Sequence, residues 1–193
     1  MASVVNIENN NLSRKIPPKM FLLYISFGSM FMFFSSLCSA IIVKKGDFKH
    51  WQDVVIPDSF FISTIIIVIS SITIQLAKNN IEQKTKFKMF SFLTVILSFL
   101  FVYFQLTGWK DLTDNGVLFR GNPSGTFIYV VSLFHVIHYL GGIFFLLLLS
   151  YKYRKVVIND TNVLNFKILT QYWHYIGLVW VLLFIFFKLL IYK

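Results

Sequence analysis

Five long apolar stretches, separated by short polar segments, dominate the pattern of the chain. They cover about residues 20–43, 59–77, 89–108, 126–150 and 171–192. Of the 18 basic and 8 acidic residues, only Lys188 lies inside one of these stretches. A transmembrane α-helix needs about 20 mostly apolar residues, and each stretch has roughly that length. The pattern therefore predicts an all-α integral membrane bundle of five transmembrane helices.

The lipid environment decides between helix and strand for these stretches. The run Ile-Ile-Ile-Val-Ile at residues 65–69 has the composition of a strand in a water-soluble protein. Inside a bilayer an open strand would leave backbone N–H and C=O groups unpaired, so a helix is the expected state. We expect the third helix to close at Gly108, and a turn at residues 122–125 to precede the fourth.

The composition excludes a water-soluble enzyme. The 193 residues are 56% hydrophobic and 13% charged, and that charged share is about half of what soluble domains carry. A chain of this length keeps a large surface and cannot bury so many apolar side chains in water. We expect residues 1–19 to form a polar cytoplasmic arm and residues 20–193 to form one transmembrane domain.

The net charge of +10 gives an orientation rather than a nucleic-acid partner. If all five stretches cross the membrane, residues 1–19, 78–88 and 151–170 lie on the same side. These segments hold 11 of the 18 lysines and arginines. Basic residues are enriched in cytoplasmic loops and attract anionic lipid headgroups. The N-terminus is therefore expected in the cytoplasm and the C-terminus outside.

Polar and small residues within the apolar stretches are the candidates for helix packing. At about 100° per residue, His135, His138 and Gly142 lie within about 60° of one another on the fourth helix. On the fifth helix, Trp173 and Trp180 lie on one stripe, with His174 beside it.

Small residues allow helices to approach closely. Gly28, Ser35 and Ser39 on the first helix, together with Gly177 on the fifth, are the helix-packing candidates. This pattern predicts helices that pack against protein as well as lipid.

The intramembrane histidines raise the question of a haem or metal site, because polar groups at that depth are usually functional. If the fifth helix begins near residue 171, His138 and His174 differ in depth by roughly 13 Å, too much for two axial ligands of one iron. His135 and His138 alone would supply two ligands, fewer than the usual three or four. Structural hydrogen bonds or lipid contacts are the expected role, and a proton relay stays open.

Signatures of other chemistry are missing from the sequence. It has no glycine-rich phosphate loop, no nucleophile elbow, and a single cysteine, Cys38. No aspartate or glutamate lies inside an apolar stretch, which weakens a transporter driven by ions or protons. The residues alone therefore indicate a membrane protein without catalytic or metal-binding residues of its own, a type that is most often a subunit of a larger complex.

Two motifs on the last two helices carry a family resemblance. The segment Tyr-Trp-His-Tyr-Ile-Gly-Leu-Val-Trp at residues 172–180 resembles the closing helix of subunit III of haem–copper terminal oxidases. On the preceding helix, Phe-His-Val-Ile-His at residues 134–138 and the glycines at 141–142 are similar to the family pattern of His-x-x-His followed by Gly. Residues 60–64 and 70–73 are similar to the short, five-helix bacterial form.

The resemblance covers nearly the whole chain from about Lys19 and implies a cytochrome c oxidase subunit III without the two extra N-terminal helices of longer members. Such a subunit belongs to a proton-translocating oxidoreductase of the aerobic respiratory chain, in the bacterial cytoplasmic (inner) membrane. It carries no haem or copper itself, since these lie in partner subunits. It stabilises the catalytic subunit, encloses phospholipids in a cleft and supports proton uptake.

The implied partners are subunit I by direct contact, subunit II, membrane lipids and a larger respiratory supercomplex. The implied packing and lipid-cleft residues are those of the two family motifs: His135, His138, Gly142, Trp173, His174 and Trp180.

Two positions depart from the family, and three alternatives stay open. Many members carry a glutamate at the position near Met30 and an aspartate at the position of Gly177, so a role of those acids in proton uptake does not transfer to this chain. A subunit of a quinol oxidase or of a nitric oxide reductase would share this fold. An anchor that binds b-type haem is the alternative from a different class.

Overall fold

The computed structural model describes residues 17–46, 51, 54–119, 123–155 and 160–190. Within these residues the chain forms five α-helices and no strand. The helices are α1 (Pro18–Gly46), α2 (Asp58–Asn79), α3 (Lys84–Asp114), α4 (Pro123–Lys155) and α5 (Asp160–Leu190). Each is long and apolar enough to cross a membrane, which confirms the predicted all-α bundle of five spans. Most of the predicted polar arm, residues 1–16, lies outside the described residues.

The helices are longer than the apolar stretches that predicted them. Helix α3 continues past Gly108 to Asp114, so the predicted end at Gly108 is wrong. Helix α4 begins at Pro123, a residue well suited to the first helical position, within the segment predicted as a turn. Helix α5 begins at Asp160, well before residue 171. Hydropathy marks only the part of a helix inside the hydrocarbon core, whereas backbone hydrogen bonds continue into the polar interface.

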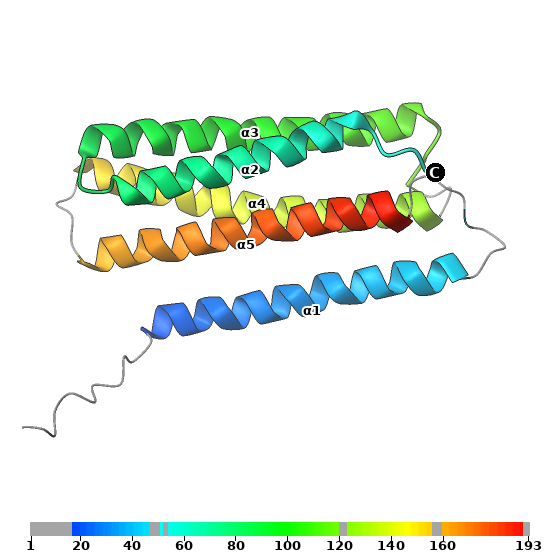
Figure 1. The fold of residues 1–193 in the computed structure, drawn as a ribbon, viewed down its shortest axis with the longest axis horizontal. Coiled ribbons are helices and arrows are strands. Elements are labelled where there is room, and N and C mark those ends of the chain that lie inside the picture. The colour runs from blue at the N-terminus through cyan, green and yellow to red at the C-terminus, as the bar shows by residue number, and fades with distance from the viewer. Residues whose placement is uncertain (1–16, 47–50, 52–53, 120–122, 156–159, 191–193) are drawn as a thin grey trace, which may run out of the picture.

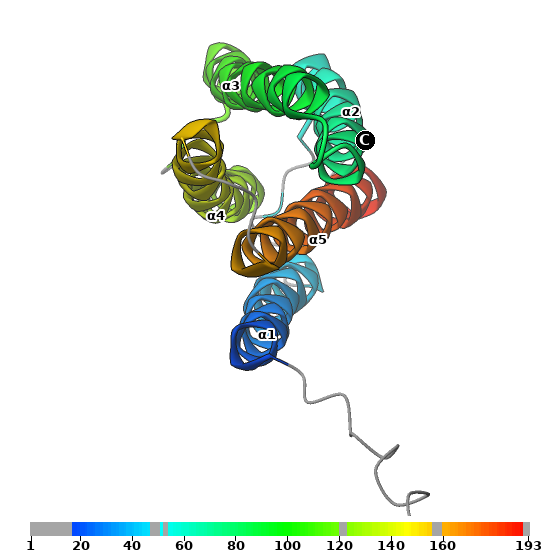
Figure 2. The same cartoon turned by 90° about the vertical axis from the view of Figure 1, so that its left-hand side faces the viewer.

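Four of the helices form a closed ring. Helix α2 packs on α3, α3 on α4, α4 on α5, and α5 on α2. The end-on view in Figure 2 shows this arrangement, and the side view in Figure 1 shows the helices running along a common direction. Short connections between consecutive helices, such as residues 80–83 between α2 and α3, are typical of an up-and-down bundle.

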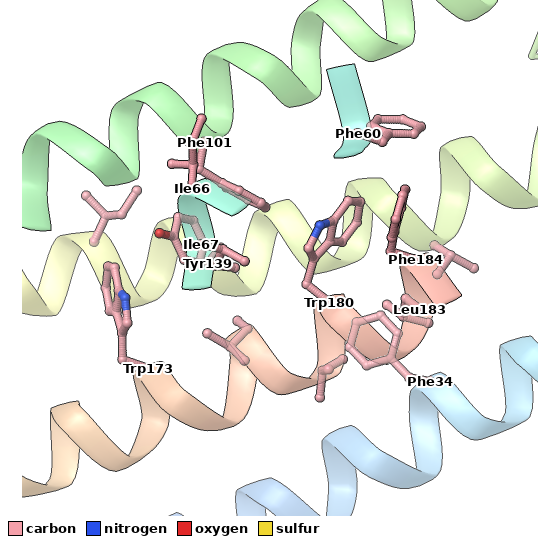
Figure 3. Packing of buried hydrophobic residues seen from close by; sticks show 14 of the residues in the cluster. Phe34, Phe60, Ile66, Ile67, Phe101, Tyr139, Trp173, Trp180, Leu183 and Phe184 are labelled. Carbon is pink, nitrogen blue, oxygen red and sulfur yellow. The ribbon is translucent and has the colours of Figure 1, made fainter. Parts of the chain in front are cut away.

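Large aromatic side chains fill the interior of the ring (Figure 3). Phe60, Phe101 and Trp180, from three different helices, are fully buried. The Trp180 ring lies edge-on to Phe60 at 5.9 Å and to Phe101 at 5.7 Å between centroids. A side chain at Gly108 would clash with this cluster, because a Cβ there would lie 2.5 Å from Phe60 Cε1. Gly108 therefore allows α2 and α3 to approach closely, rather than ending a helix.

Helix α1 lies outside the ring and packs only on α4 and α5 (Figure 2). Only 17% of its most apolar stretch is buried, against 44% for α2, α4 and α5. The Phe27 ring stacks on the Tyr175 ring at 4.1 Å, and the Tyr175 hydroxyl donates to the Phe27 carbonyl at 2.8 Å. Near the opposite end of α1, the Lys45 ammonium donates to the Leu190 carbonyl. A few specific contacts thus attach α1 to the ring and leave most of its surface open.

Candidate functional site

The two tryptophans of the closing helix point into the ring and hold α5 against α2. The Trp173 indole N–H donates to Ser70 Oγ at 3.2 Å, and the Trp180 indole N–H donates to Thr64 Oγ1 at 3.0 Å. Both side chains are fully buried, which satisfies the need of a buried indole for an acceptor. Gly177 lies between them, and a Cβ there would meet only Ile67 of α2, at 3.8 Å. This stripe of α5 is a packing surface that lipid does not reach.

His135 is buried at the centre of the ring. Its imidazole lies 4.9 Å from the Trp180 ring between centroids, and its Nε2 lies 3.0 Å from the main-chain carbonyl of Ile176 on α5. A carbonyl can only accept, so Nε2 carries the proton and donates it. Nδ1 is buried and has no partner among the described residues.

His138 faces the junction between the ring and α1. Its Nδ1 donates to the Phe134 carbonyl one turn earlier on α4, at 2.7 Å. Its own main-chain carbonyl accepts the Tyr172 hydroxyl of α5 at 2.8 Å. The ring of Phe34, on α1, lies 6.0 Å from the imidazole. His138 therefore lies where α1, α4 and α5 meet.

His174 lies on the side of α5 that faces α2 and takes part in a chain of hydrogen bonds. The Ser71 hydroxyl is bonded to its Nδ1, and its Nε2 lies 3.1 Å from Gln75 Oε1. The Gln75 amide in turn donates to Asn79 Oδ1 at 3.1 Å. With an oxygen acceptor at Nε2, the imidazole donates there and accepts the Ser71 proton at Nδ1.

The predicted depth difference of about 13 Å between His138 and His174 is wrong. It assumed that the fifth helix begins near residue 171, but α5 begins at Asp160, so His174 lies well inside the helix. The hydrogen bond from Tyr172 to His138 places the two histidines at similar depth. The two histidines differ in their hydrogen-bond partners rather than in depth. His138 bonds within α4, whereas His174 bonds to α2.

The described residues contain no group of three or more His, Cys, Asp or Glu side chains that could hold a metal ion. Among the described residues, His135 Nδ1 and His138 Nε2 are the imidazole nitrogens without a hydrogen-bond partner in the protein. Both lie on α4, and neither belongs to a group of three possible metal ligands among the described residues. This donor set is poorer than the three or four ligands usual for zinc.

Gly142 lies where α4 and α5 approach each other closely. A Cβ at this position would lie 3.0 Å from Tyr172 Cε1 and 3.3 Å from Trp173 Cζ3. At the adjacent Gly141, nothing lies within 4 Å of a Cβ. Of the two glycines, only Gly142 is therefore required by packing within the described bundle.

The small residues singled out on α1 have no packing role within the described bundle. Gly28, Ser35 and Ser39 are all exposed, and a Cβ at Gly28 would meet nothing within 4 Å. The Ser35 hydroxyl donates to the carbonyl of Phe31, four residues earlier on the same helix. These residues lie on the surface that α1 presents to its surroundings.

Two grooves lie where α1 meets the ring. Groove A, of about 540 Å³, is lined by α1, α4 and α5, including Leu23, Gly141 and Phe145. Groove B, of about 750 Å³, is lined mainly by α1 and α4, including Met30 and His138. The position where many members of the resembled family carry a glutamate, near Met30, thus lines a groove shared with a motif histidine.

The sequence interpretation missed the polar face of α3. Its buried residues include Thr94, Ser98 and Gln105. The Gln105 amide donates to Ser63 Oγ of α2 at 2.9 Å, and the hydroxyls of Thr94 and Thr73 lie 2.9 Å apart. These contacts stabilise the α2–α3 pair inside an apolar bundle. The signal was present in the sequence as polar residues recurring every three, four or seven positions along the third stretch.

The comparisons with known proteins agree on one family. The sequence profile of cytochrome c oxidase subunit III matches residues 19–192. Cytochrome c oxidase subunit 3 of Alkalihalophilus pseudofirmus is 30% identical over 138 residues, which cover 68% of this chain and 66% of the relative. The Corynebacterium diphtheriae protein of the same name is 25% identical over 161 residues, covering 82% and 77%.

The aligned part of the chain spans about half to three quarters of the length of these and other relatives. The alignment with cytochrome c oxidase subunit 3 of the mosquito Aedes aegypti, at 24% identity, covers 64% of this chain and 47% of the mosquito protein. The family profile nonetheless spans all five helices, including the two motifs that place His135 and Trp180 inside the ring. The chain belongs to the cytochrome c oxidase subunit III family.

Proposed function

We propose that this chain is the accessory, non-redox subunit III of a bacterial haem–copper terminal oxidase. In this role it stabilises the catalytic subunit I by direct contact, adjoins subunit II, holds phospholipids and supports proton uptake. Haem and copper belong to the partner subunits, and cytochrome c is the electron donor of the complex. The observation that carries the proposal is the family match across residues 19–192, which covers the entire helical part of the chain.

The surface of the bundle supports an accessory role. Large apolar side chains are exposed on every helix, for example Phe31 on α1 at 64% and Phe92 on α3 at 67%. A bundle with this surface needs lipid or another apolar protein around it. Helix α1 adds a second surface with exposed small residues, which allow a neighbouring helix to approach closely.

The grooves beside α1 support the lipid-holding role. Groove A is large enough for acyl chains, and its lysine and its two hydroxyl groups already have partners. Lys19 Nζ donates to Asn165 Oδ1 at 3.2 Å, and the Tyr172 and Ser26 hydroxyls donate to carbonyls. An acyl chain has no hydrogen-bonding groups, so a groove in which the lysine and the hydroxyls are already paired suits it. Phospholipids in grooves A and B would fill the space between α1 and the ring.

The proposed support of proton uptake is indirect. The chain has Met30 and Gly177 where many relatives carry acids, and none of its apolar stretches contains an aspartate or glutamate. A carboxylate antenna on this subunit is therefore not part of the proposal. By holding lipids and packing on subunit I, the chain would preserve the shape of the proton entry in its partner.

The decisive experiment is affinity purification of the tagged chain from its native membrane. We expect a larger multi-span subunit containing haem, together with subunit II, to come with it at equal stoichiometry. Deletion of the gene should leave an oxidase that starts at the normal rate but inactivates sooner during turnover. An oxidase of unchanged lifetime without the chain would contradict the proposal, as would recovery of the chain without any haem-containing subunit.

A further inference from the structure

A third groove lies between α3 and α4, on a side of the ring that α1 does not cover. Groove C has a volume of about 330 Å³ and is formed where α3 begins and α4 ends. Its lining includes Lys88, Ser91, Phe92 and Val95 of α3, with Leu147 and Ser150 of α4. Neither of the two family motifs reaches this groove.

Two hydroxyls in groove C are buried and unsatisfied. Ser91 is only 2% exposed, and neither its Oγ nor the Oγ of Ser150 has a hydrogen-bond partner among the described residues. Serines in apolar helices usually donate to a carbonyl three or four residues earlier. Ser63 and Ser98 in the same bundle do so, at 2.9 and 2.6 Å. The two groove serines depart from that habit, and a buried hydroxyl without a partner requires an explanation such as a bound group that the described residues do not supply.

A basic side chain lies at the polar end of the groove. Lys88 lines groove C, is exposed, and forms no ion pair or hydrogen bond with any described residue. Lys84 and Lys86 lie in the first turn of α3, just before Lys88. Two hydroxyl donors and an ammonium group that belong to the lining of one groove match the oxygens of a phosphate group.

The order of residues along the groove distinguishes a lipid from a free phosphate. Moving inward along α3, Lys88 and Ser91 come first, followed by Phe92 and Val95. Helix α4 runs the other way, so Ser150 lies near the membrane surface and Leu147 lies deeper. Phe92 is 67% exposed and Leu147 is 42% exposed. A polar outer end and an apolar inner end reproduce the order of headgroup and acyl chain in a phospholipid.

We propose that groove C binds an anionic phospholipid, with its phosphate at Lys88, Ser91 and Ser150 and an acyl chain along Phe92 and Leu147. This site is separate from grooves A and B, which lie where α1 meets the ring. It requires only that the chain spans a membrane and does not depend on the proposed role in an oxidase. The lipid places a fixed negative charge at the α3–α4 interface, and its acyl chain fills the apolar part of the groove.

The test measures lipid binding to the full chain, purified from membranes together with the subunits that accompany it. Native mass spectrometry in mixed micelles counts bound phosphatidylglycerol and gives its dissociation constant, with phosphatidylcholine as the comparison lipid. We expect K88Q to weaken phosphatidylglycerol binding about fivefold, because one lysine near the surface contributes that much. We expect S91A/S150A to weaken it further, because the phosphate loses two donors.

K86Q is the matched control, because Lys86 is an exposed lysine on the same helical turn that does not line the groove. It should bind phosphatidylglycerol within twofold of the parent chain. Equal affinities of K88Q and K86Q would overturn the proposal. K88Q changes an exposed side chain and leaves the packing intact, so this comparison remains decisive even if the double serine variant fails to fold.

A second arm separates the lipid from a free anion. Inorganic phosphate at millimolar concentration is added during the phosphatidylglycerol titration. We expect it to leave lipid binding unchanged, because the acyl chain contributes to affinity. Displacement of phosphatidylglycerol by phosphate would overturn the assignment to a lipid, and equal binding of phosphatidylcholine would overturn the preference for an anionic headgroup.

Discussion

His135 on α4 donates a hydrogen bond from Nε2 to the main-chain carbonyl of Ile176 on α5, over 3.0 Å, at the centre of the helical ring. This bond joins the two helices that carry the family motifs. It also commits one imidazole nitrogen to a structural contact, while the surrounding side chains are aromatic: Trp180 at 4.9 Å and Phe101 at 5.9 Å between centroids. The residue that looks most like a ligand in the sequence thus has a structural partner.

Loss of this bond should weaken the bundle without altering the haem of the complex. We expect His135→Leu to lower the free energy of unfolding by about 1 kcal/mol, the usual size of an interhelical hydrogen bond in a membrane protein. His135→Gln, which can still donate to Ile176, should lose less. The optical spectrum of the complex should be unchanged in both variants. A missing haem band would show that His135 ligates haem and would contradict its structural role.

The pair of adjacent glycines on α4 offers a matched test of helix packing. A Cβ at Gly142 would crowd Tyr172 and Trp173, whereas one at Gly141 would meet nothing within 4 Å. We expect Gly142→Leu to separate α4 from α5, to cost about 1–3 kcal/mol by overpacking, and to reduce co-purification of the subunit with its complex. Thermal unfolding and pull-down yield measure the two effects.

The alanine variants supply the control for this test. Gly141→Ala should have no destabilising effect, and Gly142→Ala should fall between the parent chain and Gly142→Leu. Indistinguishable unfolding of Gly142→Leu and the parent chain would argue against a close approach at this site.

Haem content separates an accessory subunit from a haem-binding anchor. His138 and His174 lie at similar depth, so depth alone does not keep them from sharing an iron. The hydrogen bonds of His174 do, because Ser71 and Gln75 engage both of its nitrogens, and the imidazole would have to give up one of these bonds to ligate iron. We expect a pyridine haemochrome assay on the purified chain to give far less than one haem per chain. Stoichiometric haem would support the anchor alternative.

The distribution of basic residues predicts the orientation of the chain. The turn between α2 and α3 at residues 80–83 lies in a lysine-rich segment, so it should face the cytoplasm, with the C-terminus outside. Alkaline phosphatase, which is active only outside the cytoplasm, should be active when fused after residue 193 and inactive when inserted at residues 80–83. The opposite pattern of activities would reverse the proposed topology.

The sequence by itself determined the membrane character, the number of helices and the family. One charged residue among five long apolar stretches leaves helices as the only stable state of the backbone in lipid. The stripe that includes Trp173 and Trp180 also followed from helical periodicity, and both side chains are buried on that face. Periodicity specifies which residues share a face but not which helix that face meets.

The tertiary structure decided the partners and the helix ends. The apolar stretch of a helix ends where the hydrocarbon core ends, so hydropathy could not place the start of α5 at Asp160. The depth of His174 was misjudged as a result. Closure of α2 to α5 into a ring determined that His135 meets Ile176 and that Gly108 faces Phe60. These contacts join segments far apart in sequence, and their geometry depends on how rigid helices pack against one another, which no local pattern encodes.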